Sequence, residues 1–224
     1  MTQFDPGWVL EQEIINEINW RTKELSTIRL TPMKHDLTDE EKLVLEKYSA
    51  VAIYSLWEGF VHQSFTFYIR TINDQNLKCN DLHMNVIIHD IDSRCKLHQQ
   101  RIHKEAKSDL IKFMLKYQDK PVELSMTIPT ESNVNLKVLN KILLIFNLEQ
   151  LPDDKFRPRL DKLLMIRNKI AHGESGIKVN REVIAELIST VSDSMDALAN
   201  VIVDGYKNKK SLCPHQILDS NVKI

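Results

Sequence analysis

The chain has 224 residues and a formal net charge of −1, and 42% of its residues are hydrophobic. That is enough apolar material for an ordinary buried core, in one large domain or two small ones. With only 5 glycines and 7 prolines, the chain lacks the frequent turns that a sandwich or barrel of short strands needs. We therefore expect an all-α fold.

The cysteines and the N-terminus indicate where the protein resides. Cys79, Cys95 and Cys213 are odd in number and widely spaced, which excludes a disulfide framework and suits a reducing compartment. No basic and apolar leader begins the chain, so we expect a cytoplasmic protein. The stretch from Tyr48 to Ile69 has one charged residue, Glu58. Its polar side chains favour a buried core helix over a membrane span.

The first half of the sequence predicts two long helices. Apolar residues recur at helical spacing from Asp5-Pro6-Gly7 to Thr31-Pro32, which predicts the first helix. Thr38 and Glu41 then have the spacing of a capping box. The second helix should begin there, run to about Asn73 and occupy the centre of the fold.

The middle of the chain is less regular. A third helical stretch is predicted over residues 81–118, with a polar, basic part from 93 to 108 at which it bends or projects. Residues 121–129 alternate apolar and polar side chains between two prolines, which predicts a loop or short extended segment. Ser132 or Asn133 should cap the next helix, which reaches Leu148.

Two further helices complete the prediction. A turn at Pro152-Asp153-Asp154 leads into a helix that ends at His172, and Asn180 or a neighbour begins the last helix, which ends near Tyr206. No linker or repeat divides the chain. We predict a single helical domain over residues 1–210 and a polar tail over 211–224.

The run Arg167-Asn168-Lys169-Ile170-Ala171-His172 carries the functional hypothesis. Arg167 interrupts an apolar helical stripe, so its permanent charge needs a carboxylate partner, a cleft or an interface. Gly173 signals the helix end. Without an acidic metal cluster nearby, an Arg and a His suit metal-independent RNA cleavage, in which the His moves a proton and the Arg stabilises the phosphorane.

The charges are segregated along the chain. Residues 155–181 carry eight Lys or Arg against two acids, residues 94–120 carry eight against three, and residues 182–206 carry five acids and no Lys or Arg. We expect the basic excess to surround the motif and attract a polyanion. One histidine is half of an acid–base pair, so a symmetric second copy should supply the other half.

The motif has the Arg-x4-6-His form of the HEPN (higher eukaryotes and prokaryotes nucleotide-binding) superfamily. The segments Tyr54–Val61 and Ser132–Leu139 also resemble a nuclease-like HEPN branch of bacterial toxin and phage-defence proteins. The resemblance implies a helical bundle, a homodimer with both motifs in one cleft, and an endoribonuclease that uses Arg167 and His172. Asn168 commonly supports such sites. Some HEPN toxins carry a Tyr two residues after the His, which an antitoxin modifies, whereas this chain has Glu174, so that control is not expected.

The remaining expectations concern supporting residues and partners. Glu58 is expected to support the site, either as an acid satisfied by a donor or as the buried ion-pair partner of Arg167. RNA contacts are expected from Lys169, Arg159 and Lys162, with no metal and no cofactor. The His and Cys spacing around Cys95, His98 and His103 does not fit a metal site. RNA, a second copy and an antitoxin or defence protein are the expected partners. The alternative is a non-catalytic module that binds RNA, a nucleotide or a protein.

Overall fold

The computed structural model describes residues 5–95, 104–117, 120–131, 133–174 and 176–214. Over these residues the chain is helical and forms no strand, which confirms the predicted all-α fold. The helices are α1 (Pro6–Lys34), α2 (Asp39–Asn73), the short 3-10 helix η1 (Cys79–Asp81), α3 (Met84–Cys95), α4 (Lys104–Tyr117), α5 (Leu136–Ile145), α6 (Asp153–Ala171) and α7 (Arg181–Lys207).

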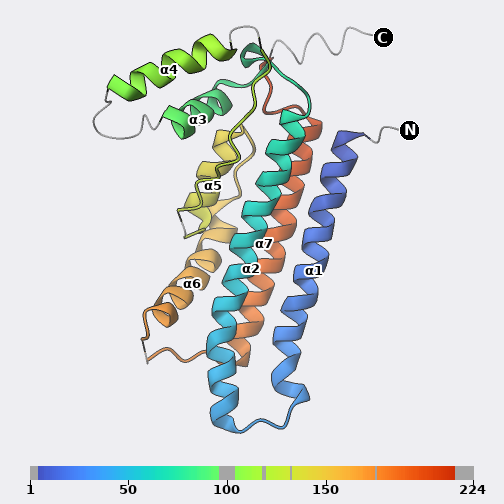
Figure 1. The fold of residues 1–224 in the computed structure, drawn as a ribbon. Coiled ribbons are helices and arrows are strands. Elements are labelled where there is room, and N and C mark those ends of the chain that lie inside the picture. The colour runs from blue at the N-terminus through green and yellow to red at the C-terminus, as the bar shows by residue number, and fades with distance from the viewer. Residues whose placement is uncertain (1–4, 96–103, 118–119, 132, 175, 215–224) are drawn as a thin grey trace.

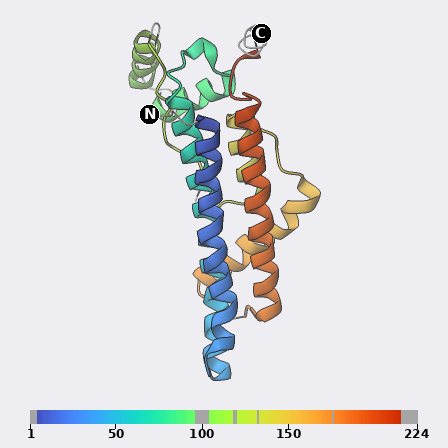
Figure 2. The ribbon, with the colours of Figure 1, turned by 90° about the vertical axis from the view of Figure 1, so that its right-hand side faces the viewer.

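Three long helices, α1, α2 and α7, lie side by side and form the body of the molecule (Figures 1 and 2). The central helix, α2, packs against α1, α6 and α7. Its largest fully buried side chains are Trp57, Tyr54, Tyr68, Phe60 and Phe65. Burying one such side chain stabilises the fold by roughly 1.5–3 kcal/mol. Most apolar side chains of the stretch 48–69 are therefore part of the core, although Tyr48 at its start is exposed. No helix of the described chain is long and apolar enough to cross a membrane.

The shorter helices surround this body. α5 and α6 run along one side of it, α3 and α4 lie across one end, and the C-terminal end of α6 points toward the other end (Figure 1). The basic residues of α4 are therefore remote from the end of α6. Within one chain, the described basic residues of α4 therefore do not surround the motif as expected, whereas the stretch 155–181 contains it. The basic residues Lys96 and Arg101 lie outside the described residues.

The predicted extended segment over residues 121–129 is held mainly by side chains, with one backbone bond from the N–H of Val122 to the carbonyl of Leu77, and no strand of the described residues pairs with it. Arg94 donates to the carbonyl of Glu123, the Asp90 carboxylate accepts from the N–H of Ser125 at 2.6 Å, and His89 contacts the carbonyl of Thr127 at 3.1 Å. These bonds come from two turns of α3 and engage alternate residues of the segment. Side chains thus hold backbone groups that a neighbouring strand would bond in a sheet.

The C-terminal end of α1 and the N-terminal end of α5 differ from the predictions, and the structure shows why. α1 continues past Pro32 to Lys34, because a proline in a last turn removes a single helix hydrogen bond. α5 is capped by Asn135, which accepts from the N–H of Val138 at 3.0 Å, and the predicted cap at Ser132 or Asn133 is wrong. Ser132 itself lies outside the described residues.

Other boundaries follow the sequence closely, except that α5 ends at Ile145 and not at the predicted Leu148. The capping box of Thr38 and Glu41 is present, α2 ends at Asn73, and Asn180 caps α7. The third helical stretch is two helices, α3 and α4, and its predicted bend falls partly on residues 96–103, outside the described part of the chain. Residues 211–213 at the start of the predicted tail bond to residues 81–83, including an isolated antiparallel bridge between Leu82 and Leu212. The domain limits stay a prediction.

Candidate active site

Two segments that are far apart in the sequence meet beside α2. The N–H of Val134 donates to the hydroxyl of Tyr54 at 2.7 Å, and the indole N–H of Trp57 donates to the carbonyl of Val134 at 3.0 Å. Both backbone polar groups of Val134 are thus held by α2 side chains, which explains why α5 begins only at Leu136. The segments 54–61 and 132–139, singled out in the sequence, come into contact here.

The helix α6 brings Arg167 to the same place. Its guanidinium carbon lies 4.6 Å from the centre of the Tyr54 ring, a favourable cation–π distance. Its Nη1 also donates to the Asn168 side-chain oxygen at 2.8 Å. A guanidinium has five N–H donors. Since Arg167 is only half-buried, donors remain that an anion could reach.

Tyr54 separates Arg167 from Glu58. Among the described residues no ion pair joins Arg167 to Glu58, so a direct pair between them is wrong. Instead the Tyr54 hydroxyl donates to a Glu58 carboxylate oxygen at 3.3 Å. Glu58 therefore contacts Tyr54 and not Arg167, and the Arg167 guanidinium contacts the Tyr54 ring and the Asn168 side-chain amide.

Tyr54 is the member of this cluster whose role could not be seen in the sequence, where it is one residue of the segment 54–61. Burial raises the pKa of Tyr54 to about 12; the Val134 N–H lowers it, Glu58 raises it and Arg167 lowers it. The hydroxyl therefore keeps its proton at neutral pH and can donate to Glu58. The signal in the sequence was the spacing of four residues between Tyr54 and Glu58, which places both on one helix face.

His172 is the C-cap of α6, and Gly173 completes the helix end. Gly173 has a φ of 79°, and its N–H donates to the carbonyl of Ile170 while the N–H of Glu174 donates to that of Lys169, both at 3.0 Å. A left-handed glycine after the C-cap is the predicted ending. The His172 side chain is exposed. It lies about 140° around the helix axis from Arg167, by the ~100° per residue of an α-helix.

The N-terminal part of α2 lies against this helix end. Lys47 donates to the carbonyl of Glu174 at 3.4 Å. Around Lys47, three large apolar side chains of α2 are exposed: Leu43 by 57%, Val44 by 51% and Tyr48 by 58%. These three residues lie within six positions of α2, beside the C-terminal end of α6.

The expected RNA-binding residues differ in their surroundings. Arg159 donates to Asp193 at 2.7 Å and Lys162 donates to Glu186 at 2.6 Å, so both bridge α6 to the acidic helix α7. Part of the basic excess of residues 155–181 is therefore matched by acids. Lys169 has no ion pair among the described residues and is the basic side chain nearest the motif in sequence.

No group of three or more His, Cys, Asp or Glu side chains within the described residues could hold a metal ion. Cys95 is buried at the end of α3, and burial raises the pKa of its thiol. His98 and His103, named with it in the sequence, lie outside the described part of the chain.

The helical body, with an Arg-x4-His run at a helix end against its central helix, defines a HEPN-type protein. A family model described as RiboL-PSP-HEPN matches residues 16–204, and the chain belongs to that family. No match was found among curated proteins or solved structures. Membership of this family indicates two functions to test, RNA cleavage and nucleotide binding.

Proposed function

We propose that the protein is a metal-independent endoribonuclease that cleaves RNA by attack of the ribose 2′-OH at a composite dimer site. One observation carries this proposal. The Arg167 guanidinium is held on the Tyr54 ring at 4.6 Å, with donors to spare, while the exposed His172 caps the same helix. A fixed cation and an accessible proton carrier are the two groups that this reaction needs most.

The proposed cleavage needs no co-reactant, because the RNA supplies both the nucleophile and the leaving group. The 2′-oxygen forms a bond to phosphorus as the bond from phosphorus to the 5′-oxygen breaks, which gives a 2′,3′-cyclic phosphate and a 5′-hydroxyl. A base removes the 2′-OH proton and an acid protonates the leaving oxygen. His172 takes one of these roles, and Arg167 stabilises the negative charge that develops on the phosphoryl oxygens.

A dimer would supply the second acid–base group, which one subunit lacks. His172 is a single acid–base group, and its position around α6 differs from that of Arg167 by about 140°. A symmetric partner would bring a second His172 to the same cleft. Lys47 bonds to Glu174, two residues after the motif, and the exposed Leu43, Val44 and Tyr48 around Lys47 support an interface there.

Binding of RNA would use the basic side chains unequally. Lys169 can contact a phosphate directly. Arg159 and Lys162 would first have to exchange Asp193 and Glu186 for phosphate, so we expect smaller contributions from them. Asn168 and Glu58 support the site, the first by its bond to Arg167 and the second through Tyr54. A cytoplasmic toxin or defence role with an antitoxin partner rests on the family resemblance.

The deciding experiment is an RNA cleavage assay of the purified protein in EDTA. We expect cleavage without added divalent metal and products that end in a cyclic phosphate, as the 2′-OH mechanism requires. RNA carrying 2′-deoxy nucleotides should resist cleavage. Salt-dependent RNA binding with no cleavage would instead favour the non-catalytic module. Cleavage that needs a divalent metal would contradict the proposal.

A pair of Tyr54 variants separates the ring from the hydroxyl. Tyr54→Phe keeps the ring under Arg167 but leaves the N–H of Val134 without its acceptor. We therefore expect this variant to lose about 1–3 kcal/mol of stability and to lose less activity than Tyr54→Leu. Tyr54→Leu also removes the cation–π contact, worth roughly 0.5–2 kcal/mol. Its cleavage rate should fall further, by about 2-fold to 30-fold relative to Tyr54→Phe. Equal rates in the two folded variants would show that the ring does not position Arg167.

A further inference from the structure

Two contacts tie the segment that contains the motif to α2. The guanidinium carbon of Arg167 lies 4.6 Å from the centre of the Tyr54 ring, and Lys47 donates to the carbonyl of Glu174 at 3.4 Å. Lys47 comes seven residues before Tyr54, whereas Glu174 comes seven residues after Arg167. The two segments therefore run antiparallel, with one contact at each end. His172 falls between the two contacts along the chain.

Lys47 and Tyr54 lie on the same face of α2. Seven residues are almost two turns of an α-helix, so the two side chains leave the helix within about 20° of each other and about 10 Å apart along its axis. The Lys47 ammonium is therefore on the same side of α2 as the Arg167 guanidinium, displaced toward the end of α6. A positive group thus stands on each side of the level of His172.

The Lys47 ammonium can accommodate an anion. Its hydrogen bond to the Glu174 carbonyl is longer than the roughly 2.7–3.2 Å of ordinary N–H···O bonds. An ammonium has three donors, so this bond leaves donors over. Within the described part of the chain no carboxylate forms an ion pair with Lys47, whereas Lys42 on the same helix pairs with Asp39 at 4.0 Å. Lys47 therefore differs from Arg159 and Lys162, which acids of α7 already hold.

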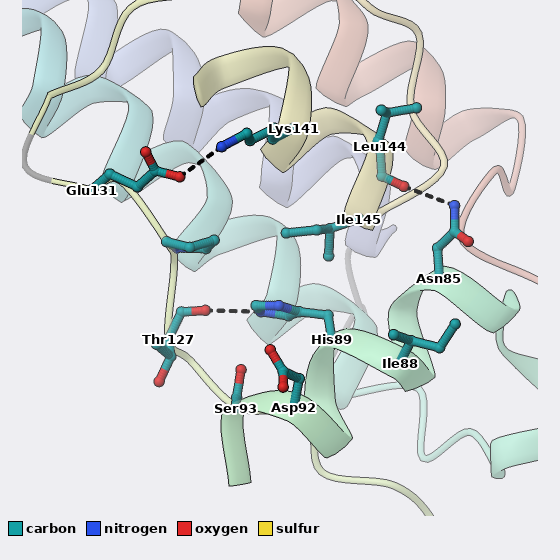
Figure 3. A pocket seen from close by; sticks show the side chains of 11 residues that line it. Asn85, Ile88, His89, Asp92, Ser93, Thr127, Glu131, Lys141, Leu144 and Ile145 are labelled. Atoms are coloured by element: carbon teal, nitrogen blue, oxygen red, sulfur yellow. Dashed lines mark hydrogen bonds and ion pairs between the residues drawn. The ribbon is translucent and has the colours of Figure 1, made fainter. Parts of the chain in front are cut away.

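A pocket of about 770 Å³ between α3, α5 and the extended segment offers a contrast (Figure 3). Its lysine, Lys141, pairs with Glu131 at 2.9 Å across the pocket. A phosphate would have to displace the Glu131 carboxylate there. At Lys47 it would meet only a long bond to a neutral carbonyl.

We propose that Lys47 binds the phosphate next to the scissile phosphate, which Arg167 binds, so that the RNA strand runs along α2 past His172. The inference rests on the proposed RNase function and deepens it. A lysine side chain is long and flexible, so it can follow a neighbouring phosphate of the same strand. The preferred substrates are then internal bonds of an RNA strand, because a dinucleotide has no second phosphate for Lys47.

The first test measures RNA binding without cleavage. The probe is a short RNA strand whose 2′-hydroxyls are methylated, which prevents 2′-OH attack, and its affinity is followed by fluorescence anisotropy over a series of salt concentrations. One phosphate contact to a single strand contributes about 0.7 to the slope of log K against log [salt]. Lys47→Ala should lower the slope by about that amount and weaken binding by about threefold to tenfold at low salt. Lys47→Arg, which keeps the charge, should bind like the wild type.

Two lysine variants are the matched controls. Lys42→Ala removes the same charge from the same helix, at a position about 140° around the axis from Lys47. Lys141→Ala removes it from the pocket of Figure 3. Both should keep the wild-type salt slope and an affinity within about twofold of the wild type, because each of these lysines is already held by a carboxylate.

The second test uses cleavable RNA in which single phosphates beside the cleavage site are replaced by uncharged methylphosphonates. At one neighbouring position the replacement should lower kcat/KM of the wild type by about threefold to tenfold. The same replacement should have much less effect on Lys47→Ala, because the contact is already lost. The comparison is a double-mutant cycle between one side chain and one phosphate.

The proposal is wrong if Lys47→Ala matches Lys42→Ala in salt slope and affinity, if Lys47→Arg does not retain binding, or if every methylphosphonate slows Lys47→Ala as much as the wild type. It is also wrong if Lys47→Ala binds less RNA only because it unfolds or changes its oligomeric state, which a thermal melt and light scattering would show. A wild type that binds RNA and leaves it intact would contradict the RNase function alone, since the salt slope still tests Lys47. A wild type that binds no RNA would overturn both.

Discussion

Replacement of His172 by alanine is expected to lower the rate of RNA cleavage by about 10²-fold to 10⁴-fold, the usual contribution of a general acid or base. The melting temperature should stay close to that of the wild type, because the imidazole is exposed and the helix end is held by backbone bonds of Gly173 and Glu174. Cleavage in EDTA and a thermal melt measure the two effects on the same preparation.

A second solvent-exposed histidine provides the control for this result. His62 is also exposed, on α2, and His62→Ala should cleave RNA at the wild-type rate. If His172→Ala keeps wild-type activity, proton transfer by this residue is excluded. If it loses activity only because it unfolds, the melt will reveal a structural role that its exposure does not lead us to expect.

Replacement of Arg167 by alanine is expected to reduce cleavage by about 10²-fold to 10³-fold, as loss of one charge-stabilising donor does in other enzymes. Arg167→Lys keeps a charge but not the planar group that stacks on Tyr54 and bonds to Asn168. We therefore expect lysine to restore only part of the activity. Single-turnover rates at saturating protein separate this effect from weaker RNA binding.

The matched control is Arg157→Ala, on the same helix. Arg157 is held in a surface ion pair with Asp153, and such pairs contribute about 0–1 kcal/mol. This variant should keep most of its stability and activity. If Arg167→Ala instead lowers the free energy of unfolding by several kcal/mol, and the folded fraction still cleaves RNA, then Arg167 is a structural residue and the proposed mechanism is wrong.

Local patterns in the sequence accounted for most helix boundaries. The capping box at Thr38, the cap at Asn180 and the glycine ending at Gly173 all appear where the residue types predicted them. These features depend on hydrogen bonds between residues a few positions apart, which any stretch of chain can form by itself. The prediction failed at α5, where the backbone of Val134 bonds to Tyr54 and Trp57 instead of to a helix.

The sequence by itself determined an all-helical chain whose Arg167 and His172 stand at one helix end. The surroundings of Arg167 were decided by tertiary packing, because Val134 and Tyr54 are 80 positions apart and Arg167 is farther still. No local sequence pattern shows that the Arg167 guanidinium contacts the Tyr54 ring and not the Glu58 carboxylate. The same holds for Arg159 and Lys162: their charges were evident in the sequence, but their pairing with α7 acids depended on which helices lie side by side.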